Sequence, residues 1–313
     1  MNAIDVAANE GREATRARYP DDEGYVDRDG VRIFYEVYGN GEPTVFSLPT
    51  WSVLHSRIWK AQIAYFARHF RVLTMDGRGN GRSDRPLEAA AYEPQEFYSD
   101  AIAVMDATGT ERAVTVSLSA GTAWNLILGA FAPERVLATV FVGPTVYAVS
   151  GPFPEWATTP YNERFDSYDG FTGQNRYFIR DHYREFAEWW SGLCTPEPHS
   201  TRPIEFAVEM FMCTTPEVIV ATLDASQMDQ RTCSAERLEE AGQQLRPLAQ
   251  QLRCPALVIQ GGLDGIALPH WARALAEDTR AELVMVEDAG HTLNARKPVR
   301  FNLALREFVD RLR

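Results

Sequence analysis

Three residues whose side chains can together perform nucleophilic catalysis occur in the order Ser119, Asp264 and His291 along the 313-residue chain. Ser119 lies in the segment VTVSLSAGTAW, in which an apolar stretch ends at a serine with small neighbours and a helical segment follows at once. This pattern is typical of a sharp strand-to-helix turn, whose strained backbone leaves little room for neighbouring side chains. Such a turn would present the Ser119 hydroxyl at the end of a sheet and point the Ala120 N–H, at a helix N-terminus, toward developing negative charge. The alternative interpretation is that Ser119 only caps the helix.

The segments IQGGLDG and EDAGHTL place Asp264 and His291 directly after two predicted strands. Because reactive groups in a parallel sheet gather beyond the carboxyl ends of the strands, both side chains could meet Ser119 at one edge. A carboxylate that orients an imidazole, which in turn takes the proton of a serine hydroxyl, can carry out acyl transfer. We therefore expect Ser119 to be the nucleophile, His291 the base and Asp264 the orienting acid. The nearby Asp288 is expected to be a solvated loop residue.

Short apolar segments alternate with amphipathic ones and supply the elements that would position these residues. The predicted strands are VRIFYEVYG (31–39), TVFSLP (44–49), RVLTMD (71–76), AVTVSL (113–118), VLATVFVG (136–143), ALVIQG (256–261) and ELVMVE (282–287). Helices are expected near residues 59–66, 101–107, 119–131, 236–252 and 271–276, and over a final segment with Phe301, Leu305 and Phe308 on one face. Strands and helices in regular succession predict an α/β fold with a mostly parallel central sheet flanked by helices.

This succession is interrupted between Pro144 and Cys233, where the sequence shows no clear buried strand and twelve aromatic residues lie between Phe153 and Trp190. We interpret residues 145–233 as an inserted helical lid, residues 25–144 and 234–313 as the core, and residues 1–24 as an N-terminal tail. A helical cap over the core is the alternative for that tail. We expect most of the aromatic rings to form the small core of the lid itself and the others to line an apolar pocket.

The composition argues against several classes of function. The net charge of -12, from 31 basic and 43 acidic residues, disfavours binding to nucleic acid or to anionic lipid. The first eighteen residues lack the apolar stretch of a signal peptide, and the run from Ala138 to Val149 is too short to span a bilayer. The four cysteines, at positions 194, 213, 233 and 254, show no clustering of the kind that binds metal. We therefore expect a cytoplasmic protein with reduced thiols and no bound metal, with a disulfide as the alternative.

The chain resembles the α/β-hydrolase superfamily, of the lidded serine hydrolase or esterase type, over nearly its whole length beyond residue 25. The resemblance rests on the serine turn, on the order Ser, Asp, His, and on MDGRGNGRSDRP (75–86), which looks like the family's loop after an early core strand. It implies a catalytic triad of Ser119, Asp264 and His291, an oxyanion hole formed by the backbone N–H groups of Trp51 and Ala120, and no cofactor. The glycines at 77, 79 and 81 do not fit the GxGxxG spacing of a nucleotide-binding loop, so a structural loop is expected there.

The sequence departs from the family pattern at two places. The serine turn reads S-x-S-x-G, with Ser117 where glycine is usual, and serine is small enough to fit. Pro49-Thr50 replaces the usual His-Gly pair ahead of the oxyanion residue, and proline has no N–H and a fixed φ, so the donors there could differ from those of the family. The alternative position for the acid holds Gly143 and Pro144 rather than a carboxylate. Because position 119 is serine, the aspartate nucleophile of dehalogenases and epoxide hydrolases of this fold is excluded.

The expected function is a serine hydrolase that cleaves a small, hydrophobic carboxylic ester, lactone or thioester through an acyl-enzyme. Two alternatives stay open. One is hydrolysis of a carbon–carbon bond or an amide by the same triad, and the other is a ligand-binding or regulatory module of this fold with little turnover. The departure at Pro49-Thr50 favours the module, whereas the complete triad argues against it. A small-molecule substrate is the one partner that these features predict, and the sequence leaves the oligomeric state open.

Overall fold

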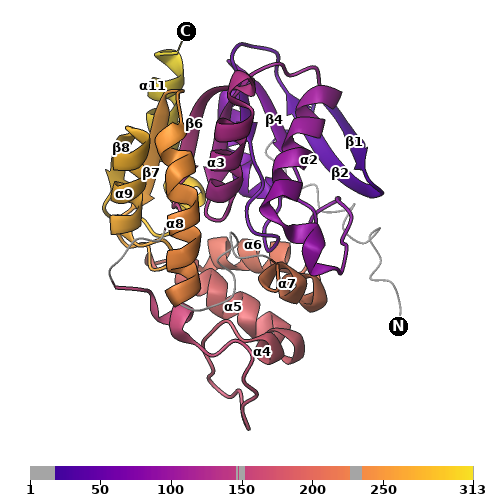
Figure 1. Ribbon diagram of the computed structural model, residues 1–313, viewed down its shortest axis with the longest axis vertical. Helices are drawn as coiled ribbons and strands as arrows, with labels where there is room; N and C mark the ends of the chain where they lie inside the picture. The colour runs from indigo at the N-terminus through magenta and orange to yellow at the C-terminus, as the bar shows by residue number, and fades with distance from the viewer. Residues whose placement is uncertain (1–17, 146, 148–151, 226–234, 313) are drawn as a thin grey trace.

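An eight-stranded sheet lies at the centre of the molecule, with helices packed on both of its faces (Figure 1). The computed structural model describes residues 18–145, 147, 152–225 and 235–312. The strands lie in the order β1-β2-β4-β3-β5-β6-β7-β8, and only the pairs β1–β2 and β2–β4 are antiparallel. Their bounds are β1 Asp22–Arg28, β2 Val31–Tyr38, β3 Thr44–Ser47, β4 Arg71–Met75, β5 Ala113–Leu118, β6 Val136–Val142, β7 Ala256–Gly261 and β8 Glu282–Val286. The predicted α/β fold with a mostly parallel sheet is confirmed.

The strands whose bounds the sequence predicts well are fully buried, whereas the strand that it does not predict is largely exposed. Every residue of β5 and β7 is buried, because helices cover both faces of these central strands, and their sequences are continuous apolar runs. Their predicted bounds agree with the structure. β1 has no counterpart in the prediction, because acidic residues occupy most of its exposed positions and no apolar run marks it. It pairs with β2, and Asp22–Gly24, which fall inside the predicted tail of residues 1–24, belong to this strand.

Two layers of helices cover the sheet. One layer consists of α2 (Pro94–Ala107), α3 (Gly121–Phe131), α8 (Ala235–Gln251) and α9 (Pro269–Thr279), and the other of α1 (Lys60–Phe66) and α11 (Pro298–Asp310). Short helices in the connections are η3 (Ser56–Trp59), η4 (Ala89–Tyr92), η5 (Pro133–Arg135) and α10 (Leu293–Arg296). The predicted apolar face of the last helix is confirmed, since Phe301, Leu305 and Phe308 are all buried against α1 and the sheet. α2 begins at Pro94, earlier than predicted, because proline suits the first turn of a helix.

The chain between β6 and α8 leaves the sheet and forms helices at one end of the core, at the bottom of Figure 1. These helices are η6 (Glu155–Thr158), α4 (Arg176–Asp181), α5 (Tyr183–Cys194), α6 (Thr201–Phe211) and α7 (Pro216–Leu223). No strand occurs in the described parts of residues 144–233. The described residues from 145 to 225 are termed the insertion below. Residues 226–234, which contain the end of the predicted lid, lie outside the described part of the chain.

The aromatic rings of the insertion do not form a separate core. Phe186 and Trp190 of α5 belong to the same cluster of buried side chains as Trp51 and Trp124 of the sheet domain. Phe165, Tyr168, Phe171 and Phe178 do pack on one another within the insertion, as expected, but this packing continues into the core instead of being separate from it. Phe186 and Trp190 make the ring contacts that join the insertion to Trp51 of the sheet domain.

Polar contacts hold the glycine-rich loop after β4, in agreement with its expected structural role. Arg78 is buried and donates through Nε and Nη2 to the two carboxylate oxygens of Asp100, at 2.8 Å each. Asn80 Nδ2 donates to the carbonyl oxygen of Ser52 at 2.8 Å. The loop therefore anchors the segment that directly follows Trp51, one of the predicted oxyanion residues.

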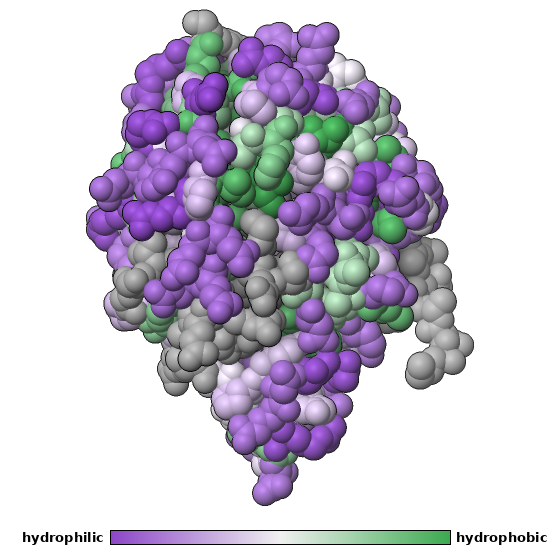
Figure 2. All heavy atoms as spheres, in the orientation of Figure 1, coloured by the Kyte–Doolittle hydropathy of each residue, from purple (hydrophilic) through white to green (hydrophobic). Residues whose placement is uncertain are grey.

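Hydrophilic side chains cover most of the face shown in Figure 2, and hydrophobic ones gather mainly in the region of α3. Among the described residues no single helix is long and apolar enough to cross a bilayer; α6 and α7 pass that test of length and composition only as a pair, and they are bent by 87°. The thiols of Cys194 and Cys254 are free, and Cys233 lies outside the described residues.

Candidate active site

Ser119 occupies the turn between β5 and α3, and its backbone has the left-handed conformation, with a φ of 56°. This conformation strains residues other than glycine and persists only where the surroundings impose it. The Ser119 N–H donates to the carbonyl oxygen of Val142 on β6 at 2.9 Å. At Gly121, in the first turn of α3, a Cβ would lie 2.6 Å from the carbonyl oxygen of Pro49, so a side chain cannot fit there. The predicted strand-to-helix turn is therefore present, with serine at its apex.

Ser117 fits at the position where the family pattern has glycine because its hydroxyl is hydrogen-bonded. Ser117 Oγ donates to the carbonyl oxygen of Val140 at 3.2 Å and accepts from Asn125 Nδ2 at 3.1 Å. Both side chains are fully buried. This departure from the pattern therefore joins β5 to β6 and α3 without disturbing the turn.

Asp264 and His291 form a buried hydrogen-bonded pair in the loops that follow β7 and β8. His291 Nδ1 lies 2.8 Å from Asp264 Oδ2, and only 4% of His291 and 3% of Asp264 are exposed. The other carboxylate oxygen, Oδ1, accepts the backbone N–H groups of Ile266 and Ala267, at 2.8 Å each. Because a carboxylate accepts, the Nδ1 atom carries the proton, and the imidazole is left with Nε2 as its basic nitrogen.

Gly143, which directly follows β6, brings Ser119 and this pair together. Its φ of 51° is left-handed, and its neighbour Val142 accepts the Ser119 N–H. A Cβ on Gly143 would lie 3.0 Å from His291 Nδ1 and 3.3 Å from Asp264 Oδ2. Glycine is therefore favoured here both by the backbone conformation and by the imidazole packed against it. From the sequence, Gly143 is noted only because it occupies the alternative position for the acid and is not a carboxylate.

The Ser119 hydroxyl forms its hydrogen bond with Thr145 rather than with His291. Ser119 Oγ lies 2.7 Å from Thr145 Oγ1, and Thr145 Oγ1 lies 3.3 Å from the carbonyl oxygen of Gly143. Between the described residues Ser119 and His291 there is no hydrogen bond. The three predicted triad residues thus meet around Gly143, but the contact between hydroxyl and imidazole is replaced by the contact with Thr145.

The two predicted oxyanion residues lie at the start of α3 and in the loop packed against it. Ala120 is the N-cap residue of α3, where the partial positive charge of the helix dipole lies. The loop before Trp51 touches this first turn through the carbonyl oxygen of Pro49. In the residues that the structure describes, the backbone N–H groups of Trp51 and Ala120 donate to no protein acceptor. The replacement of His-Gly by Pro49-Thr50 therefore removes neither of the two predicted N–H donors, those of Trp51 and Ala120.

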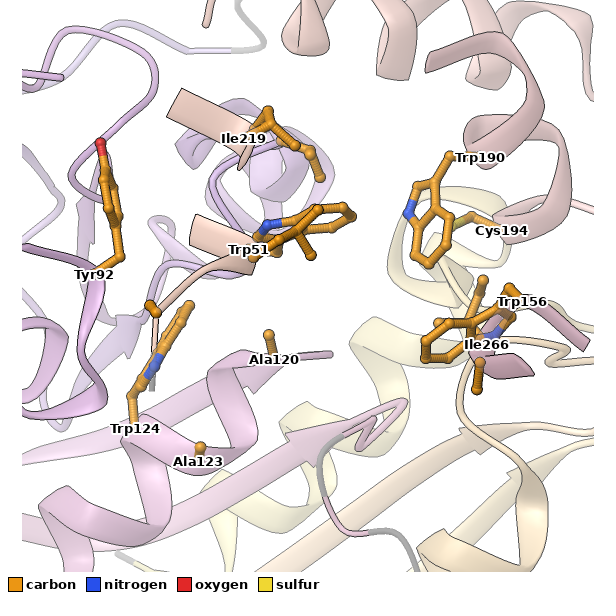
Figure 3. Packing of buried hydrophobic residues seen from close by; sticks show 14 of the residues in the cluster. Trp51, Tyr92, Ala120, Ala123, Trp124, Trp156, Trp190, Cys194, Ile219 and Ile266 are labelled. Carbon is orange, nitrogen blue, oxygen red and sulfur yellow. The ribbon is translucent and has the colours of Figure 1, made fainter. Parts of the chain in front are cut away.

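Aromatic side chains from the core and the insertion lie over this region (Figure 3). Trp51 Nε1 donates to Thr222 Oγ1 of α7 at 2.8 Å. The ring centroids of Trp51 and Trp190 are 5.4 Å apart in an edge-to-face arrangement, and those of Trp190 and Trp156 are 5.5 Å apart. Figure 3 shows Trp51 between α7 and Ala120, with Trp190 and Trp156 across from it. These rings make the surroundings of the turn apolar.

The end of α5 holds the loop that carries His291. The carbonyl oxygen of Cys194 accepts the His291 N–H at 3.0 Å, and Glu197 Oε1 accepts the Gly290 N–H at 2.8 Å. Pro196 packs so closely on Gly290 that a Cβ there would overlap it. The position of His291 therefore depends on the insertion as well as on the sheet.

Two other ionisable groups near the pair, Asp288 and the Cys194 thiol, are not placed for catalysis. Asp288 is exposed, as expected, and pairs with Lys297 at 2.7 Å and Arg300 at 2.6 Å. Burial and the nearby Asp264 carboxylate raise the pKa of the Cys194 thiol well above its ordinary value, so this thiol stays neutral and is a poor nucleophile. Within the described ranges, no group of three or more His, Cys, Asp or Glu side chains could hold a metal ion.

Four residues around the site have no role in the sequence prediction: Gly143, Thr145, Glu197 and Gln260. Gln260 Nε2 donates to Asp264 Oδ2 at 3.2 Å and so helps to fix the carboxylate. A signal for Gln260 does exist, because it is the one polar side chain in the buried strand ALVIQG. The other three act through contacts between segments that are distant in the chain, so no local pattern marks them.

Comparisons with known proteins agree with the observed fold. A family model described as alpha/beta hydrolase fold matches residues 43–298. A bifunctional esterase/perhydrolase of Acinetobacter calcoaceticus is 37% identical over 101 residues, which cover 31% of this chain and only 36% of that enzyme. The 3-oxoadipate enol-lactonase 2 of Acinetobacter baylyi is 24% identical over 90% of this chain and 94% of its own. The crystal structure of the enol-lactonase from Burkholderia xenovorans matches with a TM-score of 0.71 at 22% identity, over 92% of this chain and 100% of that one, which shows a shared fold. Since the family model covers most of the sequence, the chain belongs to the alpha/beta hydrolase fold family.

Proposed function

We propose that the protein is a serine hydrolase that cleaves a small carboxylic ester, lactone or thioester through an acyl-enzyme. Ser119 is the nucleophile, His291 the general base and Asp264 the acid that orients the imidazole, and the N–H groups of Trp51 and Ala120 bind the oxyanion. The observation that carries the proposal is the meeting of a serine in a strained turn with a buried imidazole–carboxylate pair. On this fold such a meeting is the arrangement for acyl transfer.

Acylation begins when Ser119 Oγ attacks the carbonyl carbon of the substrate and His291 Nε2 takes the hydroxyl proton. Asp264 stabilises the resulting imidazolium, because its Oδ2 is hydrogen-bonded to Nδ1 at 2.8 Å. The two backbone N–H groups stabilise the tetrahedral oxyanion, and loss of one such donor lowers turnover by about 10²–10³. The intermediate then collapses and expels the alcohol, the thiol or the hydroxyl of the opened lactone, which receives the proton from the imidazolium.

Deacylation repeats these steps with water as the nucleophile. His291 takes a proton from the water molecule as it attacks the acyl-enzyme carbonyl. The second tetrahedral intermediate then expels Ser119 Oγ, which recovers the proton from the imidazolium. The carboxylic acid leaves and the free enzyme is restored. No atom changes oxidation state in either half-reaction, so the groups of the protein and one water molecule balance the chemistry.

The apolar surroundings of the turn favour an uncharged acyl or aryl group in the substrate. Trp51 lies near Ala120 at the start of α3, and Trp190 and Trp156 lie across from it (Figure 3). Small-molecule sites are mostly apolar, with a few polar groups that fix the orientation of the ligand. The printed names of the two curated relatives, an esterase/perhydrolase and an enol-lactonase, support ester and lactone chemistry.

Labelling with a fluorophosphonate probe tests the nucleophile directly. The wild-type protein should become labelled at Ser119, as determined by peptide mass spectrometry, and Ser119→Ala should not be labelled. The thermal unfolding midpoint of the variant should stay close to that of the wild type, because the change removes one hydroxyl from a partly buried position. Labelling of the Ser119→Ala variant at an equal rate would refute the assignment.

A substrate panel separates the proposed reaction from its alternatives. p-Nitrophenyl esters of graded chain length and simple lactones should be hydrolysed, with a burst of p-nitrophenol if deacylation is slower than acylation. Labelling by the probe without hydrolysis of any ester, thioester or lactone would favour cleavage of a carbon–carbon bond or an amide. A wild-type protein that neither reacts with the probe nor turns over an ester would favour the ligand-binding module.

A further inference from the structure

We infer that Thr145 is a positioning residue that holds the Ser119 hydroxyl in a resting orientation, with its proton directed away from His291. The inference rests on the proposed function, because it concerns how the proposed nucleophile is controlled. In this orientation Ser119 is not activated. It becomes a nucleophile when its side chain turns from Thr145 to the imidazole.

Two contacts of Thr145 Oγ1 bear on which hydroxyl group donates. Thr145 Oγ1 lies 3.3 Å from the carbonyl oxygen of Gly143 and 2.7 Å from Ser119 Oγ. A carbonyl oxygen can only accept, so Thr145 gives its single proton to Gly143 when both bonds are made. Ser119 is then the donor in the shorter bond. With this pair of bonds, the proton that His291 would have to remove points to Thr145 Oγ1.

The surroundings of Thr145 favour a persistent contact. Only 5% of Thr145 is exposed, so water competes little for its hydroxyl. Its backbone follows Gly143 and Pro144, and the Gly143 N–H is itself fixed to the carbonyl oxygen of Ile259 at 3.1 Å. Because Gly143 also packs against the His291 ring, the two alternative partners of the Ser119 hydroxyl flank the same glycine.

The contact stabilises the ground state, since it must break before the proton can pass to the imidazole. A typical net hydrogen bond shifts such an equilibrium by about two- to tenfold. A variant without the Thr145 hydroxyl should therefore react faster with a serine-directed probe. A threonine that only supported the fold would have the opposite effect, because its loss would disturb the site and slow the reaction.

The experiment compares variants of the full-length protein in their second-order rate of fluorophosphonate labelling, measured across the pH range in which the protein stays folded. Thr145→Val and Thr145→Ala remove the hydroxyl, and Thr145→Ser keeps it. Thr122→Val is a matched control, because Thr122 is buried one turn after Ser119 and its hydroxyl has no hydrogen-bond partner in the described structure. Thermal unfolding midpoints identify any variant that does not fold.

We expect Thr145→Val and Thr145→Ala to be labelled about two- to tenfold faster than the wild type, and Thr145→Ser and Thr122→Val at the wild-type rate. The pH at which the rate is half-maximal should be the same in all of them, because the imidazole–carboxylate pair is unchanged. Folded hydroxyl-free variants that react at the wild-type rate or more slowly would overturn the inference.

A crystal structure of the unliganded wild type gives a second, independent test. Ser119 Oγ should lie within hydrogen-bond distance of Thr145 Oγ1, and a direct bond from Ser119 to His291 Nε2 would overturn the inference. This test does not depend on reactivity. Failure of the proposed function shows itself differently, as a wild-type protein that the probe does not label or as persistent labelling of Ser119→Ala.

Discussion

Two residues with a left-handed backbone, Ser119 and Gly143, determine the geometry of the candidate site. Their φ values are 56° and 51°. Strain at a serine between a strand and a helix is typical of functional turns, and the local sequence predicts it through the small neighbours of Ser119. Gly143 avoids the strain because it has no side chain. Its importance cannot be predicted locally, since the ring that packs on it, His291, comes from a distant segment.

Gly143→Ala should reduce turnover much more than stability. The added Cβ would lie 3.0 Å from His291 Nδ1 and 3.3 Å from Asp264 Oδ2, so the imidazole must move. Because a displacement of about 1 Å can cost about 100-fold in rate, we expect kcat for a p-nitrophenyl ester to fall by about that factor. The left-handed φ alone should destabilise the fold by about 1–2 kcal/mol, measured as the free energy of unfolding in urea.

Gly109→Ala is the matched control for this variant. Gly109 has a φ of 61°, and nothing lies within 4 Å of the Cβ that alanine would add. This variant should lose a similar free energy of unfolding and keep the kcat of the wild type. If both variants had equal kcat, the contact between residue 143 and the imidazole would have no part in catalysis.

Among the secondary-structure elements, the insertion is attached to the core at two of the loops that carry the candidate site, those of Trp51 and His291. α7 is joined to Trp51 through Thr222, and the end of α5 is joined to the histidine loop through Cys194 and Glu197. The sequence predicts that this segment is helical and free of strands, but it does not predict these attachments, because they involve one backbone carbonyl and single side chains. The insertion therefore contributes to the position of His291, in addition to covering the site.

Glu197→Ala should lower activity, and Glu197→Gln should restore most of it. Glu197 Oε1 accepts the Gly290 N–H at 2.8 Å, and alanine would leave this buried N–H without an acceptor, at a cost of about 1–3 kcal/mol. The loop next to His291 then loses a fixed position, so we expect kcat to fall by about tenfold or more with a smaller change in KM. Glutamine keeps an oxygen at the same place. Steady-state kinetics and hydrogen exchange of residues 288–292 measure the two effects.

An alanine variant with wild-type kinetics and unchanged hydrogen exchange would show that Glu197 is not needed to hold the histidine loop, and that its other contacts, such as the bond from His291 N–H to the Cys194 carbonyl oxygen, suffice. Slower turnover in both variants to the same extent would indicate that the charge of Glu197, rather than its hydrogen bond to Gly290, is the important feature. Arg296 Nε lies 3.7 Å from Glu197 Oε2, so that charge does have a neighbour of opposite sign.

For the molecule as a whole, the sequence predicts those parts that local pattern determines. The central strands β5 and β7 are continuous apolar runs, so their predicted bounds agree with the structure, whereas the half-exposed β1 was missed. The order of the candidate triad follows from the succession of strands. The orientation of the Ser119 hydroxyl toward Thr145 does not, because it depends on the path of the backbone after β6. The sequence does not predict that the rings of the insertion share a core with the sheet domain, because only the folded chain brings Trp190 against Trp51.

This shared packing predicts that the insertion and the sheet unfold together. Trp156 and Trp190 of the insertion belong to the same buried cluster as Trp51 and Trp124 of the core, so neither part can unfold without exposing apolar surface of the other. Urea unfolding followed by tryptophan fluorescence and by far-ultraviolet circular dichroism should therefore give coincident transitions. Two separate transitions would mean that the insertion is an independent domain.

Thr222→Val tests the link between the two parts within this single transition. It removes the acceptor of the bond that Trp51 Nε1 donates at 2.8 Å and leaves a buried N–H unsatisfied. The free energy of unfolding should fall by about 1–3 kcal/mol, and both optical signals should shift together because one cooperative unit is weakened. Thr122→Val, which removes a buried hydroxyl that has no described partner, should shift them far less. A shift in fluorescence without a matching shift in circular dichroism would mean that the insertion and the sheet do not unfold as one unit, and that the contact between Thr222 and Trp51 does not couple them.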